Sequence, residues 1–257
     1  MNYWQNKIVL VTGASAGFGR VLARQFAERG CQVILVARDV GKLNEAAADL
    51  SERGGRATAL PADITRAEEI KSLFARVAEG FGRLDVLANI AGKSARGEVR
   101  NTTVDEFRDL LELNFLATVA CTHAALPLLL ESHGHVINMG SLAAKGASRF
   151  IGGYPASKFP LAAYSQQLRL ELREQGLHTL LVCPGPIRRG DAGSRYDAEA
   201  NGLPPAAARP GGGVRLSGID PVRLAEKILA ACERRQAELV IPRRARLLFA
   251  LAQLSPR

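Results

Sequence analysis

The stretch KIVLVTGASAGFG, residues 7–19, decides the fold. It opens with an apolar, β-branched run that ends at Gly13, which predicts a buried strand. A helix is then predicted from Phe18 to Arg29, with Gly30 as its stop. Strand, glycine-rich turn and helix in this order, at the start of a chain, form the opening unit of a dinucleotide-binding α/β fold.

The glycines of this turn have a chemical purpose as well as a structural one. They let the backbone turn tightly and approach a pyrophosphate, and the start of the helix offers free N–H groups to the anion. Glycines also serve ordinary turns, so the prediction depends on the strand and helix that flank them. The residues that we expect to contact the cofactor here are Gly13, Ser15, Gly17, Phe18 and Gly19.

Outward from this unit, apolar runs and amphipathic segments alternate along the chain. Further strands are predicted at 31–38, 56–63, 84–92, 134–141, 177–186 and 237–242, and further helices at 41–53, 66–81, 103–131, 152–175 and 220–234. Continuous apolar strands separated by helices indicate a parallel sheet that is covered on both faces. We predict an α/β protein: one doubly wound Rossmann domain, residues 1–257, with a seven-stranded parallel sheet and helices on both faces.

The end of the second predicted strand bears on the choice of dinucleotide. An acid at this position would hold the 2′-hydroxyl of NAD, but Ala37 is followed by Arg38 and only then by Asp39. Arg38 is placed to pair with a 2′-phosphate, whereas Asp39 suits an exposed turn. NADP(H) is therefore predicted as the cofactor in preference to NAD(H).

The stretch YPASK, residues 154–158, places a phenol and an ammonium on one face of a predicted helix. A cation four residues after a tyrosine stabilises the phenolate and is expected to lower the pKa of Tyr154. Tyr-x-x-x-Lys also arises by chance, so its context matters. Ser141 ends the preceding strand, and Asn114 is a polar residue in an apolar stretch that needs a partner if buried.

Together these motifs resemble the short-chain dehydrogenase/reductase family, over about residues 6–241. The family's glycine motif matches Thr12, Gly13, Gly17 and Gly19, and its adenine-contacting acid matches Asp63, which is followed by Ile64. The family's Asn-Asn-Ala-Gly motif matches Asn89, Ile90, Ala91 and Gly92. Its Pro-Gly motif matches Pro184 and Gly185, with Ile187 after them. Two residues depart from the pattern: Ile90 replaces an Asn, and Arg189 stands where a Thr often clamps the nicotinamide.

The resemblance implies hydride transfer between a nicotinamide and a carbonyl or alcohol carbon, with a catalytic set of Asn114, Ser141, Tyr154 and Lys158. Tyr154 would donate the proton and Ser141 would hold the same oxygen. Lys158 would lower the Tyr154 pKa and bind the ribose, and Asn114 would hold a water that links Lys158 to solvent. A homodimer or homotetramer through the helices at 103–131 and 152–175 is expected by the same analogy.

Two segments stand outside this pattern. Residues 188–218, rich in Gly, Pro, Ala and Arg, predict a mobile substrate lid rather than a plain surface loop. Its arginines would suit an anionic or acyl-carrier substrate, whereas the apolar tail at 242–257 would suit a lipid or steroid. For that tail we favour a terminal helix packed on the core; a peripheral membrane contact and a subunit contact are the alternatives.

Composition excludes several other classes. The net charge is +9, but the arginines are dispersed and aromatic residues make up only 5%, which argues against nucleic-acid binding. The four cysteines lack metal-ligand spacing and are expected to be buried thiols, and His133 and His135 are expected to face solvent, so no metal site is predicted. With no signal-like start and no spanning apolar run, we expect a cytoplasmic protein. The alternative to an enzyme is a dinucleotide sensor or scaffold without turnover.

Overall fold

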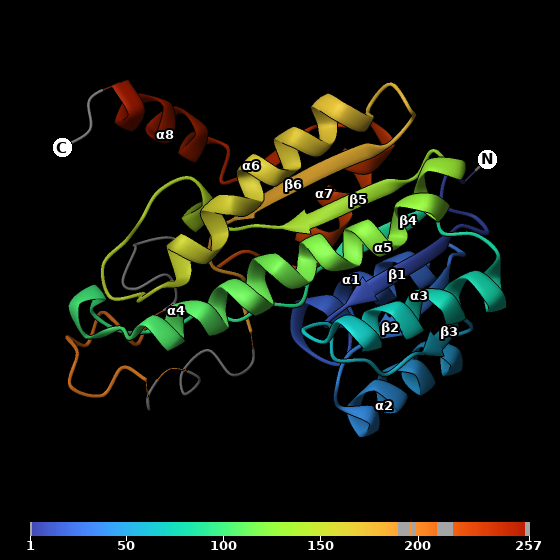
Figure 1. Ribbon diagram of the computed structural model, residues 1–257, viewed down its shortest axis with the longest axis horizontal. Coiled ribbons are helices and arrows are strands. Elements are labelled where there is room, and N and C mark those ends of the chain that lie inside the picture. The colour runs from blue at the N-terminus through green and yellow to red at the C-terminus, as the bar shows by residue number, and fades with distance from the viewer. Residues whose placement is uncertain (1, 190–195, 197–198, 210–217, 255–257) are drawn as a thin grey trace.

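The computed structural model describes residues 2–189, 196, 199–209 and 218–254, and the side chains of 252 and 253 are left aside. Its centre is a seven-stranded sheet in the order β3-β2-β1-β4-β5-β6-β7 (Figure 1). Every pairing between neighbouring strands is parallel. The strands are β1 (Ile8–Thr12), β2 (Gln32–Val36), β3 (Arg56–Ala59), β4 (Val86–Asn89), β5 (His135–Met139), β6 (His178–Pro184) and β7 (Glu238–Ile241). The predicted doubly wound α/β fold is confirmed.

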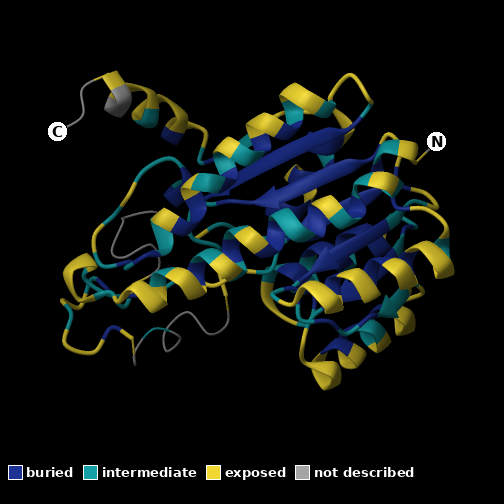
Figure 2. Ribbon diagram, viewed as in Figure 1, coloured by how far each residue is buried: buried dark blue, intermediate teal, exposed yellow. Residues whose placement is uncertain are grey.

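Helices cover both faces of this sheet because its side chains alternate. Val9 and Val11 of β1 point into a core formed with α1 (Gly17–Ala27), α2 (Val40–Glu52) and α7 (Pro221–Glu233). Leu10, between them, points into a second core formed with α3 (Ala67–Phe81) and α5 (Ala117–Glu131). A third cluster lies under α6 (Tyr154–Leu172), beside β6 and β7. Figure 2 shows the strands as the most deeply buried layer.

The strand order reverses between β1 and β4, and this topology positions the site. The chain runs outward from β1 through β2 to β3, then returns to β4 on the other side of β1 and continues to β7. Crevices at the carboxyl ends of strands, next to such a reversal, are where open α/β sheets bind ligands. The glycine turn after β1 and the loop after β4 meet there.

One predicted helix is not uniform. The run 103–131 divides into α4 (Val104–Leu111), a π-helical turn named η2 (Glu112–Leu116) and α5. The π turn widens the helix by one residue and contains Asn114, which is fully buried. Val104–Glu131 is long and apolar enough to cross a membrane by length and composition, so the expectation that no apolar run could span one is wrong on that criterion. Several α5 residues pack in the second core, so this segment contributes to the core of the fold.

The histidine predictions need a correction. His133 is exposed, but His135 begins β5 and is buried against His178 of β6. His178 Nε2 lies 2.8 Å from the carbonyl oxygen of Gln236, so that nitrogen must carry the hydrogen. His178 Nδ1 therefore accepts from His135 Nδ1 at 2.8 Å, and the Tyr3 hydroxyl donates to His135 Nε2 at 2.6 Å. Burial lowers the pKa of His135 to about 3 and that of His178 to about 4.

Cys232 lies beside this histidine pair, with one ligand atom from each of the three residues within 4.8 Å of the others. The imidazole nitrogens are already engaged in a complete chain of hydrogen bonds, so we interpret the group as satisfied core. All four cysteines are buried and free, as predicted.

The remaining elements are short or peripheral. η1 (Val99–Asn101) and η3 (Leu142–Ala144) are 3-10 turns, and α8 (Arg244–Leu254) is the terminal helix. The predicted core packing of α8 is only partly correct. Ala245 is buried and Phe249 packs on the third cluster, but Leu247, Leu248, Leu251 and Leu254 are exposed.

Candidate active site

The glycine turn after β1 adopts backbone conformations that favour glycine. Gly13 has φ +69° and Gly17 has φ +56°, both in the left-handed region. A Cβ on Gly19 would lie 2.2 Å from the carbonyl oxygen of Gly13, so no side chain fits there without moving backbone. The backbone of the turn is therefore packed closely against the start of α1.

The start of α1 suits a pyrophosphate. Within the described part of the chain no side chain caps the N-terminus of α1, and no acidic residue lies in its first turn. The guanidinium of Arg189 is close by, because a Cβ built on Gly17 would lie 3.1 Å from Arg189 Nη2. Uncapped N–H groups, the positive end of a helix and an arginine together are an anion site, and the cradle fits the expected dinucleotide.

The loop after β4 is tied to this turn. Thr12 Oγ1 accepts hydrogen bonds from the N–H groups of Ile90 at 3.0 Å and Ala91 at 3.1 Å. A Cβ on Gly13 would contact Ala91 Cα at 2.9 Å, so the two loops pack directly against each other. Ile90, which departs from the family motif, packs against the first core.

Asn89 is placed differently from a simple cofactor contact. Its side chain is 4% exposed and donates to Thr122 Oγ1 at 3.1 Å and to Asn138 Oδ1 at 3.0 Å. Its own Oδ1 has no hydrogen-bond partner among the described residues. The side chain therefore supports the sheet edge from within, and contact with a dinucleotide here falls to the backbone.

The adenine end of the predicted site lies at the tips of β2 and β3. Asp39 caps α2 by accepting from the N–H of Lys42 at 3.0 Å, which is the exposed-turn role considered above. Arg38 is 71% exposed, with Nη1 3.8 Å from Asp63 Oδ2. Asp63 also accepts from the N–H and hydroxyl of Thr65. Ile64 is buried in the second core, so its side chain does not face a ligand.

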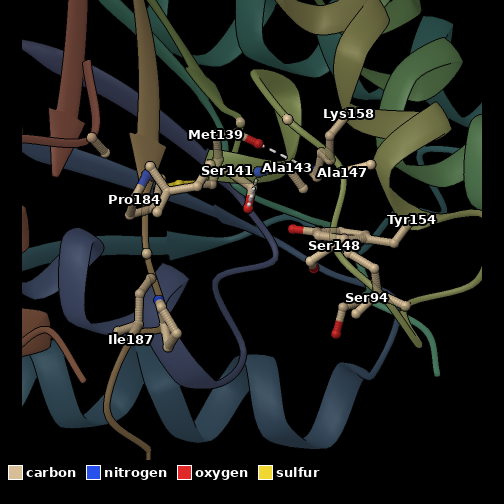
Figure 3. Close-up of a pocket in the computed structure, with 18 of the residues that line it drawn as sticks. Ser94, Met139, Ser141, Ala143, Ala147, Ser148, Tyr154, Lys158, Pro184 and Ile187 are labelled. Atoms are coloured by element: carbon tan, nitrogen blue, oxygen red, sulfur yellow. Dashed lines mark hydrogen bonds between the residues drawn. The ribbon is translucent and has the colours of Figure 1, made fainter. Parts of the chain in front are cut away.

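Beyond the glycine turn lies a cavity of about 470 Å³. Eight of the predicted site residues line it: Phe18, Gly92, Ser141, Tyr154, Lys158, Pro184, Gly185 and Ile187. Figure 3 shows Tyr154 entering from the start of α6 and Ser141 from the end of β5. The structure thus brings together, at one edge of the sheet, groups that are far apart in the sequence.

The hydroxyls of Ser141 and Tyr154 face each other in this cavity (Figure 3). Burial raises the pKa of Tyr154 to about 12, although hydrogen bonding to Ser141 and the charge of Arg96 act in the opposite direction. The predicted lowering of this pKa by Lys158 is therefore wrong: the net shift is upward, and the cation that acts on Tyr154 is Arg96. The physical reason is that a buried phenolate loses more solvation than its neighbours restore.

Lys158 is buried as well, and its Nζ donates to the carbonyl oxygen of Met139 at 2.9 Å. Burial lowers its pKa to about 8. A Cβ on Gly92 would lie 3.3 Å from Lys158 Nζ and 2.7 Å from Asn114 Oδ1, so both groups border the loop after β4. The ammonium lines the cavity and is positioned to bind a ligand hydroxyl.

Asn114 fastens the two halves of the site. Its Oδ1 accepts from the N–H of Lys93 at 2.9 Å, and its Nδ2 donates to the Lys93 carbonyl at 2.8 Å and to Ser157 Oγ at 2.9 Å. Ser157 in turn donates to the carbonyl of Tyr154 at 2.8 Å. The expected partners are thus backbone and a site neighbour, and the π turn supplies the geometry.

Comparison with known proteins agrees with this geometry. A family model described as short chain dehydrogenase matches residues 7–200. The chain belongs to the short-chain dehydrogenase/reductase family. It is 32% identical over 252 residues to dehydrogenase/reductase SDR family member 7B of Danio rerio, covering 92% of this chain and 77% of the relative.

Two solved structures of this family superpose closely. A short-chain dehydrogenase/reductase from Burkholderia phymatum in complex with NAD gives a TM-score of 0.86 at 23% identity, over 99% of this chain and 95% of that one. An actinorhodin polyketide ketoreductase with NADPH gives 0.81 at 25% identity, over 94% and 97%. The chain is therefore an oxidoreductase of the short-chain dehydrogenase/reductase family, whose members bind NAD or NADP.

Sequence reasoning missed one part of this short-chain dehydrogenase/reductase site. Arg96 is 8% exposed and lines the cavity, with its guanidinium carbon 3.6 Å from the centre of the Tyr196 ring. It donates to the carbonyls of Ala207 at 2.7 Å and Arg209 at 3.2 Å. A lone arginine in a loop gives no sequence signal, because these partners are more than 100 residues away.

The predicted lid at 188–218 is described only in part, since 190–195, 197–198 and 210–217 lie outside the described residues. The hydroxyl of Tyr196 lies 2.8 Å from that of Ser94, and Glu199 Oε2 accepts from the N–H of Arg96 at 3.1 Å. These contacts bring described parts of the segment against the loop after β4, beside the cavity.

Proposed function

We propose that the protein interconverts a carbonyl compound and the corresponding secondary alcohol with NADP(H), with Tyr154 as the acid or base. The observation that carries this proposal is the meeting of the Tyr154 and Ser141 hydroxyls inside the cavity, with Lys158 buried on its wall. A substrate oxygen placed between the two hydroxyls would have a proton donor and a second hydrogen-bond donor at once.

The chemistry divides between the cofactor and the chain. A bound nicotinamide dinucleotide supplies or accepts the hydride at C4 of its nicotinamide ring. The glycine turn and Arg189 would hold the pyrophosphate, and Lys158 would hold the ribose hydroxyls. Tyr154 would transfer its proton to the substrate oxygen, and Ser141 would stabilise the negative charge on that oxygen. Asn114 would keep the loop after β4 and the start of α6 in register.

The raised pKa of Tyr154 favours the reductive direction at neutral pH. With a pKa of about 12 the phenol is protonated and ready to donate. An alkoxide is a far stronger base than a phenolate, so proton transfer to it is downhill. Oxidation of an alcohol needs the phenolate instead, and we expect it to require higher pH.

The preference for NADP(H) rests on the residues of this chain, because its solved relatives include both an NAD and an NADPH complex. Asp39 is engaged by the N–H and, at 3.2 Å, by the ammonium of Lys42. Arg38 is largely exposed, and Arg66 lies 4.0 Å from the same Asp63 carboxylate that Arg38 faces. Two arginines, one just after β2 and one at the start of α3, favour a 2′-phosphate there.

Fluorescence titration with NADPH and NADH tests this choice. We expect NADPH to bind more tightly, and Arg38→Gln to weaken NADPH by about tenfold or more, the scale of a lost charge-assisted hydrogen bond, while NADH changes little. Lys71→Gln, a charge loss on α3, is the control. Equal losses for both dinucleotides in Arg38→Gln would contradict the assignment.

Turnover is then tested with a panel of ketones and aldehydes, by measuring the loss of NADPH absorbance with each compound. Binding of NADPH without oxidation across a broad panel would favour the alternative, a dinucleotide sensor with the same fold. The native set of Ser141, Tyr154 and Lys158 around one cavity favours the enzyme.

We also propose that the protein is a homodimer or homotetramer. Phe159 and Leu170 lie on one face of α6, eleven residues apart, and are 45% and 76% exposed. Leu116, at the junction with α5, is 47% exposed. An exposed apolar face of this kind is typical of a subunit contact, where a second copy of the chain removes it from water. Sedimentation of the native protein and of Phe159→Glu tests this, since the variant should shift toward the monomer.

A further inference from the structure

The terminal helix α8 presents an outward row of leucines. Leu247, Leu251 and Leu254 follow each other at four and three residues, and they are 66%, 53% and 82% exposed. Residues at this spacing share one face of a helix. Leu248, one position beyond Leu247, is 64% exposed on the edge of the same face. In Figure 1 this helix projects from the body of the protein beyond α6, and Figure 2 shows it largely exposed.

The opposite side of α8 attaches it to the protein. Ala245 is buried in the third cluster, and Phe249 packs against that cluster. A Cβ on Gly146 would lie 2.9 Å from the Phe249 ring, so the loop after η3 lies against this side. The helix is therefore apolar on both sides. Its inner side packs on the core, whereas its outer leucines are exposed in the described structure.

Positive charge borders the leucine row. Arg243, Arg244 and Arg246 are exposed, and none of them forms an ion pair with a described residue. The stretch 243–257, RRARLLFALAQLSPR, contains no acidic residue. The acid nearest before it, Glu238, is occupied by Lys145 at 2.5 Å. A partner that covers the leucines must therefore also accept several positive charges.

We propose that α8 docks on the surface of an anionic lipid bilayer, with its leucine row in the interfacial region and its arginines against the headgroups. A leucine face bordered by arginines is the pattern of interfacial helices, and anionic lipids attract each such cation. A second copy of the same helix matches this surface less well, because pairing would bring arginines together without a carboxylate from the segment to neutralise them.

The position of α8 gives this contact a consequence for the site. Arg244, Leu248 and Phe249 line the cavity that contains Tyr154. Leu248 is both exposed and part of that lining, so it stands at the rim. If the proposed carbonyl chemistry holds, the cavity opens beside the bilayer, and its substrate is an apolar carbonyl compound that dissolves in lipid.

Sedimentation with vesicles tests the docking without reference to turnover. The native protein should bind vesicles of phosphatidylcholine and phosphatidylserine, bind phosphatidylcholine alone weakly, and lose binding in high salt. Leu251→Ser should lower the partition coefficient about tenfold, the scale of one leucine returned to water. Arg243→Gln combined with Arg246→Gln should lower it by roughly fivefold for each arginine on mixed vesicles only.

Val40→Ser, an equally exposed apolar residue on α2, is the matched control and should leave binding unchanged. A tryptophan probe gives a second readout, because the native Trp4 is 1% exposed and insensitive to the surface. Leu251→Trp should shift its emission to the blue when mixed vesicles are added, and Val40→Trp should not. NADPH titration checks that each variant is folded, which also separates failure here from failure of the proposed function.

The proposal is overturned if the native protein binds neither kind of vesicle, or if Leu251→Ser binds as the native protein does. It is equally overturned if Leu251→Ser changes the sedimentation coefficient of the protein without lipid and leaves vesicle binding intact. That last outcome would assign α8 to a contact between copies of the chain.

Discussion

Replacement of Asn114 by alanine should lower both the free energy of unfolding and the turnover rate. The reason is that the Asn114 amide joins the loop after β4 to α6. The substitution removes three hydrogen bonds, two to Lys93 and one to Ser157. The Lys93 backbone is within reach of water, so each of those bonds contributes about 0.5–1 kcal/mol, whereas the buried bond to Ser157 contributes about 1–2 kcal/mol. The free energy of unfolding should fall by about 2–4 kcal/mol in total.

This energy converts into a change in melting temperature. At about 2.1 cal/mol/K of unfolding entropy per residue, a chain of 257 residues loses about 2 °C for each kcal/mol, so Asn114→Ala should melt about 4–8 °C lower. Calorimetry and urea denaturation measure the loss. Asn101→Ala is the control, because that exposed amide makes a single bond of 3.4 Å to Glu98.

The same variant distinguishes two roles for Asn114. A residue that only held a water for proton resupply would lower turnover and leave stability unchanged. If Asn114 joins the loop after β4 to α6, its loss lowers both turnover and stability. Asn114→Asp should then give values between those of the native protein and of Asn114→Ala, since its carboxylate accepts from the Lys93 N–H but cannot donate to Ser157. An unchanged melting temperature in Asn114→Ala would refute the fastening role.

Three further predictions follow from the site and the core. Tyr154→Phe should cut turnover by about 100-fold or more, the scale of a lost general acid, and leave the NADPH dissociation constant nearly unchanged; retained turnover would remove Tyr154 from the mechanism. Gly19→Ser should destroy NADPH binding because its Cβ would meet the Gly13 carbonyl at 2.2 Å, whereas Gly80→Ser, with no atom within 4 Å, should leave the titration unaltered. The neutral pair His135 and His178 should make the protein acid-sensitive: the folded pKa values of about 3 and about 4 lie below the unfolded value of 6.5, so stability is complete above pH 6.5 and falls as pH drops toward 4. Denaturation across this range should show a slope of up to about 1.4 kcal/mol per pH unit for each histidine, and His178→Gln should flatten it while the exposed His123→Gln should not.

Sequence reasoning reached the fold and selected eight residues that line one cavity, because local patterns carry this information. The glycine spacing after β1 is required by a single turn, and Tyr154 and Lys158 are brought together by one turn of α6. Continuous apolar strands between helices leave few arrangements other than a parallel sheet. Ser141 ends a predicted strand, and ligands bind at the carboxyl edge of such sheets, so its position made it a candidate site residue.

Properties that depend on residues far apart were decided only by the tertiary structure. The pKa of Tyr154 moves upward because burial, which no local spacing reports, outweighs the hydrogen bond to Ser141 and the charge of Arg96. His135 was expected in solvent but pairs with His178 across two strands. Arg96 is held at the cavity wall by hydrogen bonds to the carbonyls of Ala207 and Arg209.

The terminal helix shows the same division most clearly. Its apolar and basic composition can be read in the chain, and so can its helical spacing. Which of its faces is covered depends on where the core ends, and a pattern of residues does not contain that information. Sequence by itself therefore determined the helices and strands and the chemical groups they carry. Packing determined which groups are buried, which are paired and which remain exposed to a partner, because solvation and contact are properties of the assembled fold.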